Sequence, residues 1–482
     1  MERESFRSRL GFILISAGCA IGIGNVWRFP YVVGNSGGGF FVLLYLFFLV
    51  IMGVPILTME YAVGRASRKS AAYAFNTLEK KGQKWHVMRY VALVGCYILM
   101  MFYTVVAGWM LYYFYLMASG AFTGLDAQGV ETVFAGMLAK PGVMAAYTIG
   151  IIVVGFAVCS LGLKKGLERF SKWMMLALLG IMIVLAVRSI FLSGGEEGLA
   201  FYLLPSMEKM REAGLGQVVT AAMTQSFFTL SIGISAMEIF GSYLTRERTL
   251  LGETFMVCGL DTLVAVVSGL IIFPACFAFG VSADSGPRLI FITLPNVFNA
   301  MPGGRVWGAL FFVFMTFAAF STVIAVFENL IALTTELTGI SRKKATVING
   351  ALLILLSMPC VLGFNVLSGF EPLRAGNSVM DLEDFLVSNV LLPVGSLAYV
   401  LFCTSRRGWG WKKFQAEANH GKGPKLPNGL RIYCTYILPV LVAVILVYGL
   451  VTYFKKTWGR CLVQRPFSAL ERKTVPFFAV LM

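Results

Sequence analysis

The segment LGFILISAGCAIGIGNVWRFPYVVG, residues 10–34, is apolar enough to enter a membrane, but its middle is unsuited to an unbroken helix. Gly18, Gly22 and Gly24 interrupt it, and Asn25 follows directly. In hydrocarbon an unpaired backbone group costs several kcal/mol, so an unwound segment is tolerated only where it lines a cavity or is buried in protein. Freed carbonyls can hold a cation, and freed amides can hold an anion. The segment therefore indicates a binding site at an interrupted membrane helix.

The same glycines have two other interpretations. The Gly18–Gly22 spacing is also typical of a packing face between two membrane helices, and the local sequence does not decide between the two. A dinucleotide-binding fingerprint is disfavoured, because no β-strand pattern precedes the glycines and no acidic residue follows at the required distance. The rest of the chain favours the binding site.

The composition is that of a multi-pass membrane protein. The 482 residues are 58% hydrophobic and 13% charged, and the mean hydropathy is +0.78. The net charge of +16 fits basic cytoplasmic loops better than nucleic acid, so the expected partners are membrane lipid and a small molecule. No cleavable signal peptide is expected, because the apolar stretch runs on to Arg28 without a small-residue cleavage site.

The reactive side chains do not resemble those of an enzyme. The nine cysteines are odd in number, lie mostly in apolar spans and form no CxxC pair, which disfavours a zinc site or a disulfide framework. His86 and His420, the only histidines, lie in basic loops. A histidine-based triad or metal centre is therefore not expected.

Hydropathy predicts eleven membrane spans, each long enough to cross about 30 Å of hydrocarbon. They lie near 10–34, 39–63, 87–119, 142–161, 170–192, 216–243, 254–281, 305–335, 345–364, 383–404 and 432–454. Lys and Arg concentrate before the first span and in every second loop, which predicts a cytoplasmic N-terminus in a cell membrane. The basic C-terminal tail breaks this pattern, since eleven spans would place it outside. The semi-polar segment 282–303 is predicted to fold back as a lid over the outer face.

The sixth span also has a polar centre. In TAAMTQSFFTLSIGISAMEIFGSY, residues 220–243, Thr229, Ser231, Gly233 and Ser235 separate two apolar halves. These hydroxyls could simply bond back to helix carbonyls. However, interrupted helices at corresponding positions are the mark of an inverted repeat with a site near the midplane. We therefore predict two five-span repeats, residues 1–192 and 193–405, followed by an eleventh helix and tail, residues 406–482.

Acidic residues inside spans are costly and indicate function. Glu60, Glu238, Asp261 and Glu328 stand out. Asp261 has no basic residue near it in its own span, which favours a cation ligand, whereas Glu60 could satisfy loose backbone at a helix break. In the eighth span, Ser321 and Thr322 could offer hard oxygen ligands suited to Na⁺, or could be small polar packing residues.

At this point the sequence resembles the neurotransmitter:sodium symporter family, in particular its bacterial amino-acid transporters. The resemblance is spread over residues 9–405, in family order and spacing. It is carried by RLGFILISAGCAIGIGNVWRFPYVVGNSGGG (9–39), GVPILTMEYAVGR (53–65), KKGLERFSKW (164–173), QSFFTLSIGISA (225–236), FITLPNVF (291–298) and FAAFSTVIAVFE (317–328). It implies an all-α, LeuT-like five-plus-five inverted repeat with unwound first and sixth helices.

The resemblance also implies two sodium sites. The first would use the Ala20 carbonyl and the side chains of Asn25, Thr229 and Asp261, completed by the substrate carboxylate. The second would use the carbonyls of Gly18, Ile21 and Ala318 and the hydroxyls of Ser321 and Thr322.

The substrate carboxylate would meet the amides around Gly22–Gly24 and the Tyr103 hydroxyl. The implied substrate residues are Cys19, Ala20, Gly22, Ile23, Gly24, Leu99, Tyr103, Phe228, Thr229, Ser231, Ile234, Ser235, Thr322 and Val326. The implied outer gate has Arg28 facing Asp384 and Tyr103 closing with Phe228. In the implied inner gate, Arg3 pairs with Glu336 near Tyr243.

Two positions refine the expected function. Amine-transporting relatives carry an aspartate at the place of Gly22, so a glycine there implies a substrate with its own carboxylate. Asp261 and Ala265 stand where chloride-dependent relatives have asparagine and a chloride-binding serine. A fixed negative charge near sodium can do what chloride would do. Chloride independence is therefore expected, although Tyr45, Gln225 and Thr229 match other chloride-site positions.

The sequence thus predicts a sodium-coupled symporter of a neutral, hydrophobic or aromatic amino acid, working by alternating access. Two alternatives stay open: a membrane amino-acid receptor that binds without transport, and proton coupling through Asp261. Glu238 has no assigned role.

Overall fold

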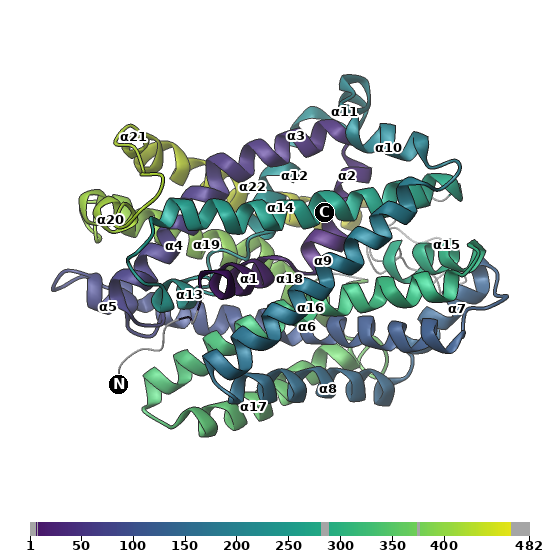
Figure 1. Cartoon of the computed structure of the whole chain (residues 1–482), viewed down its shortest axis with the longest axis horizontal. Coiled ribbons are helices and arrows are strands. Elements are labelled where there is room, and N and C mark those ends of the chain that lie inside the picture. Colours follow the sequence, from purple (N-terminus) through teal and green to yellow (C-terminus); the bar gives the residue numbers. More distant parts are fainter. Residues whose placement is uncertain (1–5, 7, 281–288, 374–375, 464–482) are drawn as a thin grey trace.

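The protein is a bundle of helices in the computed structural model, which describes residues 6, 8–280, 289–373 and 376–463 (Figure 1). Nine helices in this described part are long and apolar enough to cross a membrane. A tenth span is formed by two helical pieces, 9–20 and 24–35, bent by 57°. Extended structure in the same residues is limited to the isolated bridges Gly38–Pro205 and Arg248–Lys422.

The first half of the chain holds five predicted spans. Its elements are α1 (Arg9–Ala20), η1 (Gly24–Arg28), α2 (Phe29–Asn35), α3 (Gly39–Phe48), η2 (Leu49–Gly53), α4 (Val54–Ser67), α5 (Ala74–Leu78), η3 (Trp85–Val87), α6 (Met88–Ser119), α7 (Ala127–Leu138), α8 (Pro141–Ser160), η4 (Leu163–Leu167) and α9 (Glu168–Ile190).

The second half follows with α10 (Glu196–Leu203), α11 (Met207–Ala213), α12 (Leu215–Phe228), α13 (Glu238–Tyr243), α14 (Leu250–Ala278), η5 (Leu289–Thr293), α15 (Leu294–Ala300), α16 (Gly304–Thr338), α17 (Arg342–Leu362), α18 (Val379–Phe385), η6 (Leu386–Leu391), α19 (Leu392–Thr404), α20 (Trp411–Ala418), α21 (Leu430–Ile432), η7 (Tyr433–Ile437) and α22 (Leu438–Val463).

Two spans are interrupted, as the sequence predicted. The first break, residues 21–23, separates α1 from η1, and the second break, residues 229–237, separates α12 from α13. α12 and α13 are too short to cross a membrane alone, but together they occupy the predicted sixth span. The first break is narrower than the glycines suggested. α1 continues through Gly18 to Ala20, and the Ile21 amide still donates to the Ala17 carbonyl at 2.6 Å.

α1 lies in the middle of the bundle, in contact with α9, α14 and α16, and α6 and α16 run side by side (Figure 1). α13 packs against α4 through close backbone contact. A Cβ atom on Gly241 would come within 2.5 Å of the Tyr61 carbonyl oxygen. Small residues allow membrane helices to approach in this way. α13, which directly follows the second break, is therefore held against α4.

π-helical turns precede five of the prolines in the spans. Five of the six π-helical segments in the described chain end just before an X-Pro pair, at Pro30, Pro55, Pro295, Pro393 and Pro439. Proline lacks an amide hydrogen and displaces the carbonyl four residues earlier, so the helix widens there. Tyrosines satisfy two of these carbonyls. Tyr433 donates to the Ile51 carbonyl at 2.7 Å, and Tyr113 donates to the Phe291 carbonyl at 3.0 Å.

The segment predicted to be a lid is described from residue 289 onward, and residues 282–288 lie outside the described residues. Its π-helical turn places Phe291 in an aromatic cluster. The ring centroid lies 6.0 Å from that of Trp27, 5.6 Å from that of Trp109 and 4.9 Å from that of Tyr113. η5 is thus packed against the η1 and α6 side of the molecule, and its role as a lid stays a prediction.

Candidate functional site

The end of α1 turns its last carbonyls toward two hydroxyls of α16. The Thr322 hydroxyl lies 3.3–3.4 Å from the carbonyl oxygens of Gly18, Cys19 and Ile21. The Ser321 hydroxyl lies 3.3 Å from the Ile21 oxygen and 2.8 Å from the Ala318 oxygen. The structure brings all five residues of the predicted second sodium site together in a buried cluster, which we call the α1–α16 cluster. Such a set of hard oxygens suits an alkali cation.

A second polar cluster joins η1, the second break and α14. The Asn25 side-chain amide donates to Asp261 Oδ1 at 2.7 Å and to the Thr229 hydroxyl at 3.0 Å. The Thr229 hydroxyl donates to Asp261 Oδ2 at 2.9 Å. All three side chains are buried, and Ala20 lies at the last residue of α1. The two oxygens of Asp261 thus accept from neutral donors, so a bound cation could balance a carboxylate here.

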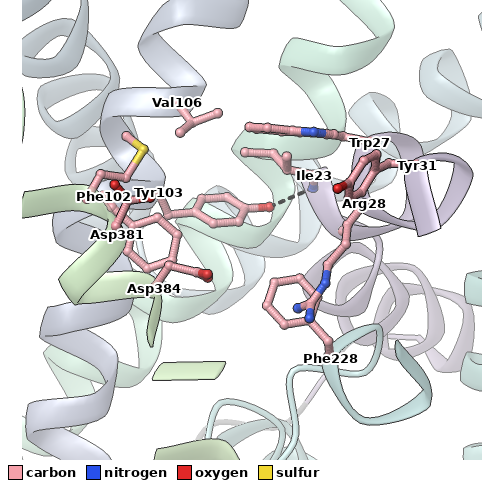
Figure 2. A pocket seen from close by; sticks show the side chains of 12 residues that line it. Ile23, Trp27, Arg28, Tyr31, Phe102, Tyr103, Val106, Phe228, Asp381 and Asp384 are labelled. Carbon is pink, nitrogen blue, oxygen red and sulfur yellow. Dashed lines mark hydrogen bonds between the residues drawn. The ribbon is translucent and has the colours of Figure 1, made fainter. Parts of the chain in front are cut away.

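A cavity opens between η1, α6, α12 and α18 (Figure 2). At its edge, the Ile23 amide donates to the Tyr103 hydroxyl at 3.0 Å. Gly22 leaves no room for a side chain, because a Cβ atom there would collide with the Tyr103 hydroxyl and come within 2.8 Å of Thr322 Oγ1. The lining residues are Ile23, Gly24, Trp27, Arg28, Tyr31, Phe102, Tyr103, Val106, Phe228, Met380, Asp381 and Asp384.

The predicted outer gate lines this cavity without an Arg28–Asp384 ion pair. Figure 2 shows Arg28 and Asp384 on opposite sides of it. The Arg28 guanidinium carbon lies 4.2 Å from the centroid of the Phe228 ring, a cation–π distance. Asp384 instead accepts from the Ser388 hydroxyl at 2.9 Å. The two charges therefore face each other across the space that Tyr103 and Phe228 also line.

Ten of the fourteen predicted substrate residues do not line the cavity. They are Cys19, Ala20, Gly22, Leu99, Thr229, Ser231, Ile234, Ser235, Thr322 and Val326. Ile234 is completely buried, its carbonyl accepts from the Cys96 thiol at 3.4 Å, and its Cγ2 atom fills the space beside Gly95. In this conformation, Ile234 packs against α6 and does not line the cavity.

The predicted inner gate forms two separate groups of contacts. Arg3 lies outside the described residues. Glu336 accepts from the Ser70 hydroxyl at 2.9 Å, whereas the Tyr243 hydroxyl donates to Glu328 at 2.8 Å. Glu328 is also ion-paired with Arg342. These partners explain how an acidic residue is accommodated inside the eighth span.

The sequence interpretation missed half of the residues that line the cavity: Trp27, Tyr31, Phe102, Val106, Met380 and Asp381. Three of them had a usable signal. Tyr31, Val106 and Asp381 lie three positions from Arg28, Tyr103 and Asp384, a spacing that shares one face of a helix. The others become visible only once the helices are packed.

Interrupted spans beside buried oxygen clusters and a cavity define a membrane transport protein. The chain belongs to the Sodium:neurotransmitter symporter family, whose model matches residues 3–124 and 128–466. It is therefore a sodium-dependent, multi-pass membrane transporter and not an enzyme. This confirms the predicted family, fold class and absence of an enzymatic function.

Relatives support the same assignment. An uncharacterized sodium-dependent transporter of Bacillus subtilis, YhdH, is 34% identical over 395 residues, covering 82% of this chain and 86% of the relative. An uncharacterized sodium-dependent transporter of Haemophilus influenzae is 29% identical, covering 93% and 98%. The crystal structure of MhsT in complex with L-phenylalanine is 34% identical, with a TM-score of 0.83, and covers 93% of this chain and 100% of MhsT. The fold is thus LeuT-like.

Proposed function

We propose that this protein couples the entry of two sodium ions to the uptake of a neutral, hydrophobic or aromatic amino acid by alternating access. The observation that carries this proposal is the meeting of the Ile23 amide and the Tyr103 hydroxyl, 3.0 Å apart, at the first break. Both groups can donate to a carboxylate. The side-chain-free Gly22 next to them supplies no carboxylate of the protein's own.

The substrate would therefore bring the negative charge itself. A carboxylate replacing the Ile23–Tyr103 contact would accept from both donors, and charge-assisted hydrogen bonds of this kind are about twice as strong as neutral ones. The ammonium group would meet free carbonyls of the two breaks. An amine without a carboxylate would leave these donors unpaired, which disfavours it as a substrate.

The two sodium ions would bind in the two polar clusters. One ion would bind in the α1–α16 cluster, held by Gly18, Ile21, Ala318, Ser321 and Thr322. The other would bind among Ala20, Asn25, Thr229 and Asp261, after the Asn25 amide turns its oxygen inward. Sodium beside Asp261, the first of the two predicted sites, would touch the substrate carboxylate, so each would favour binding of the other.

Chloride independence is part of the proposal. Asp261 supplies a fixed carboxyl beside the sodium position, completely buried on α14. One turn later, Ala265 has no group that could hold an anion. A carboxylate here would neutralise the cation as an added chloride would in relatives that need one.

The proposed side-chain preference follows from the lining. Trp27, Phe102, Val106 and Phe228 give the cavity aromatic and aliphatic walls. Binding of L-phenylalanine by MhsT, at 34% identity, supports an aromatic or large aliphatic side chain. Cys19, Leu99, Ser231, Ile234, Ser235 and Val326 would surround the substrate side chain, with Leu99, Ile234 and Val326 moving apart to receive it.

The remaining assignments concern the transport cycle. Arg28, Asp384, Tyr103 and Phe228 would close the outer side, and Arg3, Glu336 and Tyr243 would close the inner side. We propose a cytoplasmic N-terminus in a cell membrane, and a division into repeats at residues 1–192 and 193–405 with a C-terminal part at 406–482. The paired breaks in the first and sixth spans support this division.

Uptake of labelled L-phenylalanine into sealed proteoliposomes tests the function. Accumulation is expected only with an inward sodium gradient, and without any need for chloride. Phenethylamine, which keeps the ring but lacks the carboxylate, is expected not to compete. Binding without accumulation would indicate a receptor, and accumulation driven by a pH gradient without sodium would indicate proton coupling. Either result would overturn the proposal.

A further inference from the structure

Ser235 adopts a backbone conformation that few side chains tolerate. Its φ angle is 63°, and that of Ser231 is 49°. The only other non-glycine residue with positive φ in the described chain is Arg68, which ends α4 in an ordinary helix cap. Two serines in the left-handed region within one break store backbone strain, which persists only where the surroundings impose it.

The surroundings of Ser235 form a buried chain of hydroxyl and carboxyl groups. The Ser235 hydroxyl lies 2.7 Å from the Tyr399 hydroxyl, and the Tyr399 hydroxyl donates to Glu238 Oε2. All three side chains are completely buried. Tyr399 uses its one proton on Glu238, so Ser235 donates to Tyr399. We call these three residues the Ser235 relay.

α19 holds the relay from behind. Gly233 lies directly on this helix, since a Cβ atom there would come within 2.8 Å of the Ser396 hydroxyl oxygen and even closer to the Leu392 carbonyl. The Tyr399 ring packs on Phe75 with centroids 5.1 Å apart. Tyr399 therefore has little freedom to follow Ser235 if the second break shifts.

Glu60 binds the backbone of the same break. Its Oε2 accepts from the Gly233 amide at 3.3 Å, and it also faces the backbone amides of Ser235, Met237 and Glu238. Glu60 thus satisfies the main chain, whereas Glu238 ends a side-chain relay. The family resemblance left Glu238 without a role, and the relay gives it one.

On the basis of the transport function proposed above, we propose that Glu238 and Tyr399 are positioning residues for substrate binding. Through the relay they hold Ser235 in its left-handed conformation and so fix the shape of the second break, against which the substrate side chain would pack. Without the relay, Ser235 would keep a buried hydroxyl without an acceptor and would relax toward an ordinary φ angle. The wall of the substrate site would then lose its shape.

Glycine provides the decisive comparison, because it adopts positive φ without steric cost. Tyr399→Phe is measured in the wild-type, Ser235→Gly and Ser231→Gly backgrounds. In wild type it is expected to raise the KM for L-phenylalanine uptake about tenfold, as the loss of one buried hydrogen bond would. In Ser235→Gly the same change is expected to have an effect of about twofold or less, since the strained residue is gone. Ser231→Gly is the matched control, because Ser231 is strained but lies outside the relay, and there the tenfold effect should persist.

Substitutions of Glu238 provide a second test of the Ser235 relay. Glu238→Gln keeps an acceptor for the Tyr399 hydroxyl and should raise KM less than Glu238→Leu, which removes it. The thermal midpoint of the substrate-free protein is measured for every variant. Tyr399→Phe should lower this midpoint in the wild-type and Ser231→Gly backgrounds, and should lower it much less in Ser235→Gly. An equal effect of Tyr399→Phe in all three backgrounds, or no effect in wild type, would overturn the relay. Failure of wild-type uptake would instead count against the transport function, because the coupling in the thermal midpoint does not need substrate.

Discussion

The two helix breaks satisfy their unpaired backbone groups in opposite ways. The first break is three residues long, and its groups face hydroxyls and amides that a ligand can replace: Ser321, Thr322, Tyr103 and Asn25. The second break is nine residues long, and buried carboxyls of the protein itself hold it at Gly233, through Glu60, and at Ser235, through Tyr399 and Glu238. A short break can leave its backbone for ions and substrate, whereas a long one needs permanent partners.

This difference assigns separate tasks to the two breaks. Glycines at the first break bring Tyr103 and Phe228 close to the backbone, so the main chain itself can bind. At the second break, left-handed serines and Gly233 fit the chain onto α19. The first break would supply most ligands, and the second would supply a shaped wall. Substitutions at the two places should therefore fail in different assays.

The largest effect is expected at Glu60. Glu60→Leu removes an acceptor that faces three backbone amides of the second break and the Glu238 amide at the start of α13, in a site with no exposed surface. Leaving such groups unpaired costs on the order of 3–5 kcal/mol. We expect little folded protein, measured as monodisperse material after extraction in detergent. Glu60→Gln keeps one acceptor oxygen and should give much more. Normal yields of Glu60→Leu would show that the second break does not depend on this carboxyl.

The next effect concerns the ions. Asp261→Asn should fold, because asparagine can accept from Asn25 or Thr229, but it removes the proposed negative charge beside sodium. The sodium concentration for half-maximal uptake should rise about tenfold or more, since a charge-assisted contact contributes ~1.5–3 kcal/mol. Uptake should also become sensitive to chloride.

Asp126→Asn is the matched control for this charge. Asp126 is an exposed residue that caps α7, and asparagine caps a helix equally well. It should leave the sodium dependence unchanged. If Asp261→Asn behaved in the same way as Asp126→Asn, Asp261 would not be a sodium ligand.

A smaller effect is expected for the substrate contact. Tyr103→Phe leaves the ring in the cavity wall and removes the hydroxyl that meets Ile23. The KM for the amino acid should rise about tenfold, while the sodium dependence of the α1–α16 cluster should change little. Tyr97→Phe on the same helix removes a hydroxyl bonded to Asn349, away from the first break, and serves as control. Equal KM values for the two variants would remove Tyr103 from the carboxylate site.

Much of this arrangement could be predicted from the sequence, because membrane spans stand out by their long apolar stretches. The predicted spans match the observed helices to within a few residues, and glycines and clustered hydroxyls located both breaks. Motif residues such as Thr229, Asp261, Ser321 and Thr322 lie far apart in the chain and meet in two clusters. Backbone breaks and ligand-bearing motifs are local features, so a sequence can display them.

Other features depended on packing and were not visible. The Ser235 relay joins α13 to α19 across more than a hundred and fifty residues, and no local pattern links Glu238 to Tyr399. Arg28 contacts the Phe228 ring and forms no ion pair with Asp384. This choice of partner depends on the conformation of the protein, so the sequence could not show it. The width of each break also depends on its partners, since Gly18 stays helical although glycine permits unwinding.

The smallest effect tests whether every interruption of the hydrogen bonds in a helix takes part in transport. Pro55, at the start of α4, frees the Ile51 carbonyl in η2, and the Tyr433 hydroxyl donates to this carbonyl at 2.7 Å. This interruption lies outside the two breaks and holds no proposed ligand. Tyr433→Phe should lower the free energy of unfolding by about 1 kcal/mol and the thermal midpoint by a few degrees, with unchanged KM values for sodium and substrate. A change in either KM would mean that the proline-induced turns take part in the transport cycle. Transport would then depend on more interruptions of the spans than the two breaks compared above.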